Sequence, residues 1–285
     1  MANQSDQRMS EAVRAQWEAA ADGWDAQSPA LRAWLSAPTA TMFEAAGIAL
    51  GHHVLDVGAG AGDQTLMLAE RVGPHGRVLA TDLSPKLIER LRSHALRARL
   101  DNVEARPADA QLPFAERDIF DAAVCRLGLM LMPEPSRCLA SVYAALKPGG
   151  RFSAMVFAGP EDNPCVAISM ATATRHADLP ARDPYAPGGL LSLGRPGHLD
   201  QLFLAAGFHD VSTFWLDAPF RLPSVDHYIT FLRTAAAPVR AMLSRLAPDA
   251  EEAAWQDLRG QLSVFSTPID WVGPNALIVA VGRKP

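Results

Sequence analysis

Residues 54–65, which read VLDVGAGAGDQT, constrain the fold of this chain more than any other stretch. A short apolar run leads into glycines at positions 58, 60 and 62. This order predicts a buried strand, a tight turn whose backbone can approach a ligand, and a helix that begins near Asp63. The free N–H groups at the start of such a helix favour an anionic group of the ligand.

Strands and helices alternate on both sides of this loop. The apolar pattern predicts strands at residues 53–57, 77–81, 102–105, 120–125, 151–157, 211–216 and 276–281. Capped helical stretches separate the earlier strands, as at residues 63–71 and 84–100. Strands that alternate with helices at this spacing indicate an α/β fold, with a mostly parallel sheet and helices on both of its faces.

The glycine loop is compatible with a dinucleotide or with S-adenosylmethionine (SAM). Asp82 follows Gly62 by twenty residues, where a carboxylate would accept from the hydroxyls of a ribose. The spacing is G-x-G-x-G rather than the dinucleotide spacing G-x-G-x-x-G, and Asp56 and Asp63 flank the loop. Acidic residues at both ends would repel a pyrophosphate, whereas SAM carries an ammonium and a sulfonium. The residues therefore favour SAM.

Composition limits the other partners. Of the 285 residues, 49% are apolar and 20% charged, the net charge is −5, and the basic residues are scattered, so we expect no nucleic-acid partner. No apolar run is long enough to span a membrane, and residues 1–16 lack the apolar core of a secretory signal. No cluster has the spacing of metal ligands, and the cysteines form no C-x-x-C pair. We therefore expect a soluble, cytoplasmic protein without a metal, and self-association into a homo-oligomer stays open.

Four motifs occur in a set order: D-V-G-A-G-A-G at 56–62, T-D-L-S at 81–84, A-D-A-Q-L-P-F at 108–114 and L-K-P-G-G-R-F at 146–152. With them the chain resembles the class I SAM-dependent methyltransferases over roughly residues 50–158. Within that class it most resembles the ubiquinone/menaquinone biosynthesis C-methyltransferases. The resemblance implies a Rossmann-like sheet of seven strands whose last strand is antiparallel.

The resemblance also implies a role for each residue of the loop. Asp56, Gly58, Ala59, Gly60 and Gly62 would hold the methionine end of SAM. The relatives that act on quinones usually carry an Arg-Asn pair after the fourth strand, where this chain reads CRLGLMLMPEP. This departure puts a quinone acceptor in doubt and leaves the expectation of SAM unchanged.

Further roles fall on the ends of the later strands. Asp82 would bind the ribose, Leu83 would pack on the adenine, and Asp109 would accept from the adenine amino group beside the Ala110 N–H. Arg126 would face the sulfonium and the methyl acceptor. The residues also allow simpler readings: Asp109 could cap a turn, Leu83 could be core, and Arg126 could pair with an acidic residue.

The chain outside residues 51–158 is expected to supply the acceptor site. Residues 1–50 predict a helical cap, residues 159–197 a lid rich in Pro and Gly, and residues 198–285 the rest of the sheet with a helical insertion. Trp24, Met170 and Tyr185 are the candidate acceptor contacts, with Trp17 and Trp34 as further tryptophans of the cap. His176 is the candidate general base because its ordinary pKa lies near neutrality.

These observations predict a SAM-dependent methyltransferase that transfers a methyl group to carbon or oxygen of an apolar or aromatic small molecule. Methylation of nitrogen or sulfur is an alternative, and so is a protein that binds SAM without transferring its methyl group. An NAD(P)-dependent oxidoreductase is the rival from another enzyme class.

Overall fold

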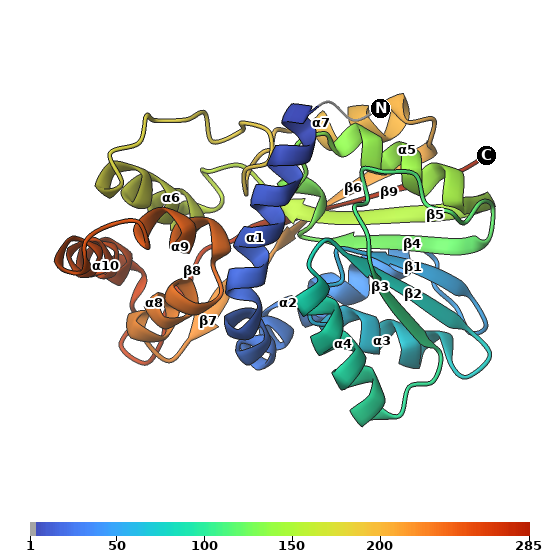
Figure 1. The fold of residues 1–285 in the computed structure, drawn as a ribbon, viewed down its shortest axis with the longest axis horizontal. Coiled ribbons are helices and arrows are strands. Elements are labelled where there is room, and N and C mark those ends of the chain that lie inside the picture. The colour runs from blue at the N-terminus through green and yellow to red at the C-terminus, as the bar shows by residue number, and fades with distance from the viewer. Residues whose placement is uncertain (1–3) are drawn as a thin grey trace.

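The computed structural model describes residues 4–285, with side chains from residue 11 onward. Within this part of the chain, seven strands form one sheet in the order β3-β2-β1-β4-β5-β9-β6 (Figure 1). Their bounds are β1 His53–Val57, β2 Arg77–Asp82, β3 Val103–Pro107, β4 Phe120–Arg126, β5 Leu146–Phe157, β6 His209–Asp217 and β9 Ala276–Arg283. The predicted α/β fold with a seven-stranded sheet is confirmed.

The sheet is parallel except at β9. This strand runs antiparallel to β5 on one side and to β6 on the other, as the family resemblance implies for the last strand. β1 lies between β2 and β4, and the chain moves outward from β1 in opposite directions. Ligands of such sheets bind beyond the carboxyl ends of the strands at this reversal, which is where the glycine loop lies.

Helices cover both faces of the sheet. On one face lie α2 (Ser28–Ala45), α3 (Asp63–Val72) and α4 (Pro85–Ala98), and on the other lie α5 (Pro135–Ala145) and α7 (His198–Ala205) (Figure 1). Since both faces are covered, β4 is buried along nearly its whole length, which explains why it reads as an unbroken apolar run.

The sequence sets the start and the inner face of α4. Ser84 accepts a hydrogen bond from the N–H of Leu87 at 3.3 Å, and Pro85 occupies the first turn. Ile88 and Leu91, which follow at helical spacing, are fully buried. This capped, amphipathic helix fixes the position of the strand end that carries Asp82.

A second helical group interrupts the chain between β6 and β9. It contains α8 (Val225–Thr234), α9 (Ala237–Leu243), α10 (Pro248–Leu262) and a two-stranded antiparallel sheet of β7 (Phe220–Leu222) and β8 (Trp271–Gly273), with α6 (Pro164–His176) against it. Its core is separate from that of the sheet, and in it the rings of Tyr228 and Trp271 stack at 4.4 Å. We call these elements the helical insertion group.

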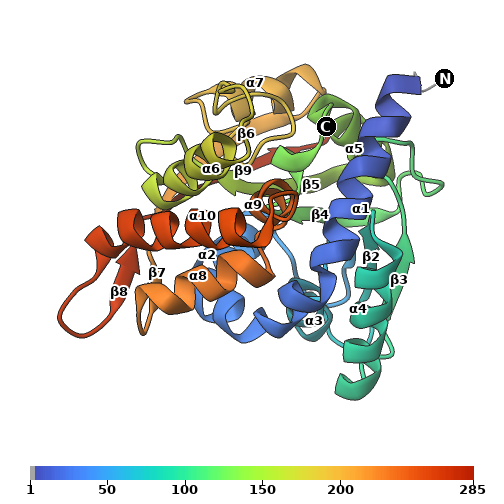
Figure 2. The same ribbon diagram turned by 60° about the vertical axis from the view of Figure 1, so that its left-hand side comes forward.

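Helix α1 (Gln4–Ala26) lies between the sheet and the helical insertion group (Figure 2). It packs on α4 on one side and on α8 and α9 on the other. Asp22 forms ion pairs with Lys86 and Arg90 of α4, and the Ala19 carbonyl accepts from Arg240 of α9. Helix α1 therefore bridges the two parts of the molecule.

The structure differs from the sequence-based expectation at two segments. β5 begins at Leu146 rather than 151, because Leu146 pairs with Phe120 of β4 and the Gly149 N–H donates to the Lys284 carbonyl. Residues 177–197 form no helix or strand, but Leu191 and Leu193 are buried in the core and Ser192 donates to the Met130 carbonyl. Much of the expected lid is thus anchored. No helix of residues 4–285 combines the length and the apolar character that a membrane crossing requires.

Candidate cofactor and acceptor site

The glycine loop makes close contact with two helices. Gly60 has a φ of +58°, and a Cβ there would lie 3.3 Å from Nε1 of Trp24 on α1. Gly62 has a φ of +96°, and a Cβ there would lie 2.7 Å from Cγ of Leu91 on α4. A side chain at either position would be strained and would push against a neighbouring helix. Gly62 therefore serves the packing of α4 rather than lining the site.

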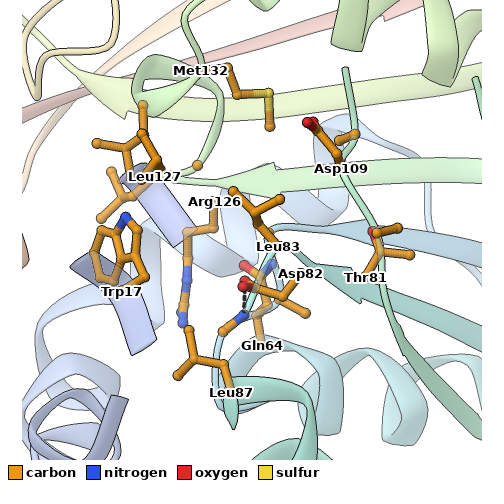
Figure 3. Close-up of a pocket in the computed structure, with 18 of the residues that line it drawn as sticks. Trp17, Gln64, Thr81, Asp82, Leu83, Leu87, Asp109, Arg126, Leu127 and Met132 are labelled. Carbon is orange, nitrogen blue, oxygen red and sulfur yellow. Dashed lines mark hydrogen bonds between the residues drawn. The ribbon is translucent and has the colours of Figure 1, made fainter. Parts of the chain in front are cut away.

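Asp82 ties the end of β2 to the glycine loop. Its carboxylate accepts from the N–H of Gly60 (Figure 3) and from the N–H of Ser84, each at 2.9 Å. Burial raises the pKa of Asp82, while the two N–H groups and that of Leu83 counteract the rise. Each carboxylate oxygen has further acceptor capacity, so Asp82 can still receive hydroxyl groups from a ligand.

Asp56 is fully buried and points toward α3 instead of the ligand side of the loop. It accepts from Oγ1 of Thr65 at 2.6 Å and from Nε2 of Gln64. Burial raises the pKa of Asp56 to about 6, against the lowering effect of these two hydrogen bonds and of Arg126. The expected direct contact of Asp56 with the cofactor does not fit this position. Asp56 holds the first turn of α3 in place.

Gln64 is a candidate site residue that the sequence reasoning missed. Its side chain is buried and donates through Nε2 to Asp56, and no described residue hydrogen-bonds its Oε1. A buried carbonyl oxygen without a donor is costly, so a ligand with an N–H group is the natural partner. The signal for this residue was its place in the first helical turn after the glycines.

Arg126 closes the far side of the loop through an ion pair. It lies at the end of β4 and donates to Asp63 of α3 at 2.8 Å and to Thr39 of α2 at 2.9 Å. Asp63 also pairs with Arg32 at 2.8 Å. The simpler reading, in which Arg126 pairs with an acidic residue, is what the structure shows. Its charge is largely neutralised before any ligand binds.

These residues surround one pocket, which we call the glycine-loop pocket (Figure 3). Of the predicted cofactor residues, it is lined by Gly58, Ala59, Gly60, Asp82, Leu83, Asp109, Ala110 and Arg126. Its described lining has three carboxylates, those of Asp63, Asp82 and Asp109, and one cation, Arg126. Asp109 accepts from the Gln111 N–H at 2.9 Å, which is the turn-capping role that the sequence left open. The pocket is therefore suited to a ligand with positive charge.

A second, apolar space adjoins this pocket, and we call it the aromatic cavity. Its lining carries the rings of Trp17, Trp24, Trp34, Phe157, Phe220, Tyr228 and Phe231. Trp34 is fixed by its Nε1, which donates to the Ala218 carbonyl at 2.7 Å, and it stacks on Phe220 at 4.8 Å. Four residues line both spaces, and we call them the shared wall: Trp17, Trp24, Leu127 and Leu131.

Three predicted acceptor or catalytic residues lie outside both spaces. His176 ends α6, and its Nε2 bonds Asp257 of α10 at 2.8 Å. Tyr185 lies in the loop of residues 177–197, and the Cζ atom of Arg195 lies 4.1 Å from the centroid of its ring. Met170 packs between the sheet core and the core of the helical insertion group. These residues contribute to packing and surface contacts, whereas Trp24 lies where an acceptor contact is expected.

Comparison with known proteins identifies the central part of the chain. Residues 49–180 match the family described as "Methyltransferase domain". This part of the chain is similar to methyltransferase domains. It resembles class I SAM-dependent enzymes of the ubiquinone/menaquinone biosynthesis C-methyltransferase type, as the sequence motifs predicted.

Two curated relatives show how far the likeness extends. The ubiquinone/menaquinone biosynthesis C-methyltransferase UbiE of Marinomonas sp. is 36% identical over 117 residues, which is 40% of this chain and 46% of that protein. The arsenite methyltransferase of Halobacterium salinarum is 35% identical over 107 residues, which is 37% of this chain and 27% of that protein. The chain thus spans half or less of the length of the first curated relatives it matches.

Solved structures agree in fold over a longer range. The superposition on the YcgJ protein from Bacillus subtilis covers 86% of this chain and 97% of that protein's chain, with a TM-score of 0.58 and 19% identity. The superposition on the [4+2]-cyclase SpnF covers 87% of this chain and 80% of that enzyme's chain, with a TM-score of 0.55 and 21% identity. At this identity the likeness concerns the fold alone.

The matched residues contribute unequally to the two spaces. Gly58, Gly60, Asp82, Asp109 and Arg126 all lie within residues 49–180, while Trp17 and Trp24 of α1 also line the glycine-loop pocket. Much of the aromatic cavity comes from outside residues 49–180, from Trp24 and Trp34 before them and from Phe220 and Tyr228 after them. The aromatic cavity is therefore built mostly from residues that the matched family does not supply.

Proposed function

We propose that this protein is a SAM-dependent methyltransferase that acts at carbon or oxygen of an apolar or aromatic small molecule. The charge of the glycine-loop pocket carries the proposal. Three carboxylates and one paired arginine suit the ammonium and sulfonium of SAM, and they oppose the two negative charges of a pyrophosphate. This is the physical reason to favour SAM over NAD(P), the cofactor of the rival oxidoreductase reading.

The proposal assigns the adenosine end of SAM to the ends of β2 and β3. Asp82 accepts from the ribose hydroxyls while it keeps its bonds to the loop. Leu83 and Ala110 contact the adenine, and Asp109, which lines the same pocket, accepts from the adenine amino group. The pocket lining supports each of these assignments.

The methionine end is assigned to the loop and to α3. Gly58, Ala59 and Gly60 let the ligand approach the backbone, and the free N–H groups of the first turn of α3 receive the carboxylate. Oε1 of Gln64 accepts from the ammonium, which gives this buried atom the donor it lacks among the described residues. Asp56 orients Gln64 and does not touch SAM itself.

The transfer step is assigned to the shared wall. Bound SAM supplies a methyl group on a sulfonium, whose departure leaves a neutral thioether. Trp17, Trp24, Leu127 and Leu131 keep this boundary dry and hold the acceptor in line with the methyl carbon. Well-oriented reactants lower a barrier by about 7–11 kcal/mol, so positioning can supply most of the acceleration.

The proposal also divides the chain by task. Residues 1–50 form the cap, 51–158 the cofactor core, 159–197 the acceptor-side segment, and 198–285 complete the sheet and carry the helical insertion. The bridging contacts of α1 with α4, α8 and α9 support the role of a cap. The three cysteines, buried and unpaired, suit the reducing cytoplasm that we propose as its location.

Calorimetric titration tests the cofactor. We expect S-adenosylhomocysteine and SAM to bind with similar enthalpy and NADH to give no heat of binding. A labelled-methyl assay over apolar acceptors then separates an enzyme from a protein that only binds SAM. Tight binding of NADH alone would overturn the proposal.

A further inference from the structure

We propose that the aromatic cavity takes a neutral, apolar acceptor whose reacting electron pair carries no proton. This inference rests on the proposed methyl transfer and changes its acceptor range: it keeps carbon, excludes a hydroxyl oxygen and admits a thioether sulfur. It depends on the chemistry of the cavity lining, which is rich in aromatic rings and among whose described residues no carboxylate or histidine can remove a proton.

The polar groups of the cavity are few, and the structure engages them. Ser169 donates to the Cys165 carbonyl at 2.7 Å, and a hydrogen bond links Ser169 to the Tyr228 hydroxyl. Burial raises the pKa of Tyr228 far above its usual range. Asn275 donates to the Gly273 carbonyl at 3.1 Å. Among the described residues that line the cavity there is no carboxylate, histidine or lysine.

The shared wall has no titratable group either. Trp17, Trp24, Leu127 and Leu131 separate the cavity from the carboxylates of the glycine-loop pocket. Of those carboxylates, Asp63 is held by two arginines, Asp82 by two backbone N–H groups and Asp109 by the N–H of Gln111. No described group is therefore placed to deprotonate an acceptor at the boundary.

This absence selects the acceptor chemistry. A phenol has a pKa of about 10, so at neutral pH its methylation needs a base that takes the O–H proton. A carbon–carbon double bond or a thioether needs none. Its electron pair forms the bond to the methyl carbon, the C–S bond breaks, and that pair stays on the sulfur of S-adenosylhomocysteine. The positive charge passes to the acceptor. A carbocation formed from an alkene then loses a proton to a water molecule that reaches the cavity after the transfer, so no positioned base is needed.

The rings of the cavity stabilise that charge. Trp17 and Trp24, which meet edge to face at 5.3 Å, belong to the shared wall where the new cation forms. The face of an aromatic ring attracts a cation, and the attraction grows when water is excluded. The acceptor enters neutral and becomes a cation only on transfer, so the rings stabilise the product of the step more than the acceptor.

A pair of probes with the same shape tests the charge preference directly. Binding of benzyltrimethylammonium and of neopentylbenzene, its neutral carbon isostere, is measured with S-adenosylhomocysteine present at saturation. We expect the cation to bind roughly 30-fold more tightly, the factor that corresponds to a cation–π gain of about 2 kcal/mol. Trp24→Leu should lose most of this preference, and Phe265→Leu, a ring outside the cavity, should keep it. If Trp24→Leu does not fold, Trp17→Leu replaces it.

Labelled SAM tests the acceptor class. Benzyl methyl sulfide and 2-methyl-1-phenylpropene represent the thioether and the alkene, and 4-methylphenol is the hydroxyl control. We expect label in one of the first two, with a kcat/KM that is flat between about pH 6 and 9, and none in the phenol.

Comparable transfer to the phenol would overturn the inference, and so would equal affinity for the two probes or an unchanged preference in the Trp24 variant. Failure of S-adenosylhomocysteine to bind would instead overturn the proposed function. The two failures are therefore distinguishable.

Discussion

Replacement of Asp82 is the sharpest perturbation of the cofactor pocket. Its carboxylate receives the Gly60 and Ser84 N–H groups at 2.9 Å each, and in our proposal it also receives the ribose hydroxyls. A hydrogen bond to a charged group contributes about 1.5–3 kcal/mol. Loss of two such bonds to ribose amounts to about 3–6 kcal/mol, or a roughly 10²- to 10⁴-fold weaker affinity.

The assay is calorimetric titration with S-adenosylhomocysteine. Asp82→Ala should abolish measurable binding, and Asp82→Asn should weaken it toward the lower end of the range, because its amide keeps one acceptor oxygen. In Asp82→Asn the amide NH₂ replaces one carboxylate oxygen, so either the Gly60 or the Ser84 N–H loses its acceptor. The glycine loop of this variant should therefore be less ordered.

Asp118→Asn is the matched control. Asp118 is an exposed carboxylate that pairs with Lys284, and it precedes β4, so it lies at the amino ends of the strands, away from the glycine loop. This variant should bind normally. Unchanged affinity of Asp82→Ala, with the fold intact by circular dichroism, would refute the ribose assignment and the reasoning behind it.

Three further outcomes follow from the same contacts. Gln64→Met should weaken the binding of S-adenosylhomocysteine about 10-fold or more. It should leave the affinity for 5′-methylthioadenosine, which lacks the amino-acid end, unchanged. Equal losses of affinity for the two ligands would disprove the ammonium assignment. Burial raises the pKa of Asp56 from 3.8 to about 6, so its ionisation costs roughly 3 kcal/mol of folding stability at neutral pH. Stability relative to Asp56→Asn should therefore rise as pH falls from 7.5 through 6 toward 4, by urea unfolding; a constant difference would contradict the burial argument. His176→Ala should keep full methyl-transfer activity, because His176 bonds Asp257 outside both spaces, and a large loss of kcat would restore it as a base.

The parts of the site that the sequence predicted are those set by local geometry. The glycine loop has to follow a strand and precede a helix, and the distance from Gly62 to Asp82 is the length of one helix and one strand. These constraints act between neighbours in the chain. The place of Asp82 at the end of the second strand, the helices on both faces and the antiparallel last strand therefore followed from pattern and resemblance.

The missing parts depend on contacts between distant segments. The partners of Arg126 come from α2 and α3, and the aromatic cavity joins rings that lie as far apart in sequence as Trp24 and Phe231. No local pattern specifies such contacts. His176 and Tyr185 were chosen because they lie in or near a loop that looked like a lid, yet the buried Leu191 anchors that loop to the core.

The central claim is that the glycine-loop pocket binds SAM with its methyl group directed at the shared wall. The structure of the complex with S-adenosylhomocysteine tests it most directly. The account predicts ribose hydroxyls on Asp82, the amino group on Oε1 of Gln64, and the sulfur beside Leu127 and Trp24. A ligand whose sulfur faces away from the aromatic cavity, or one bound elsewhere, would contradict it.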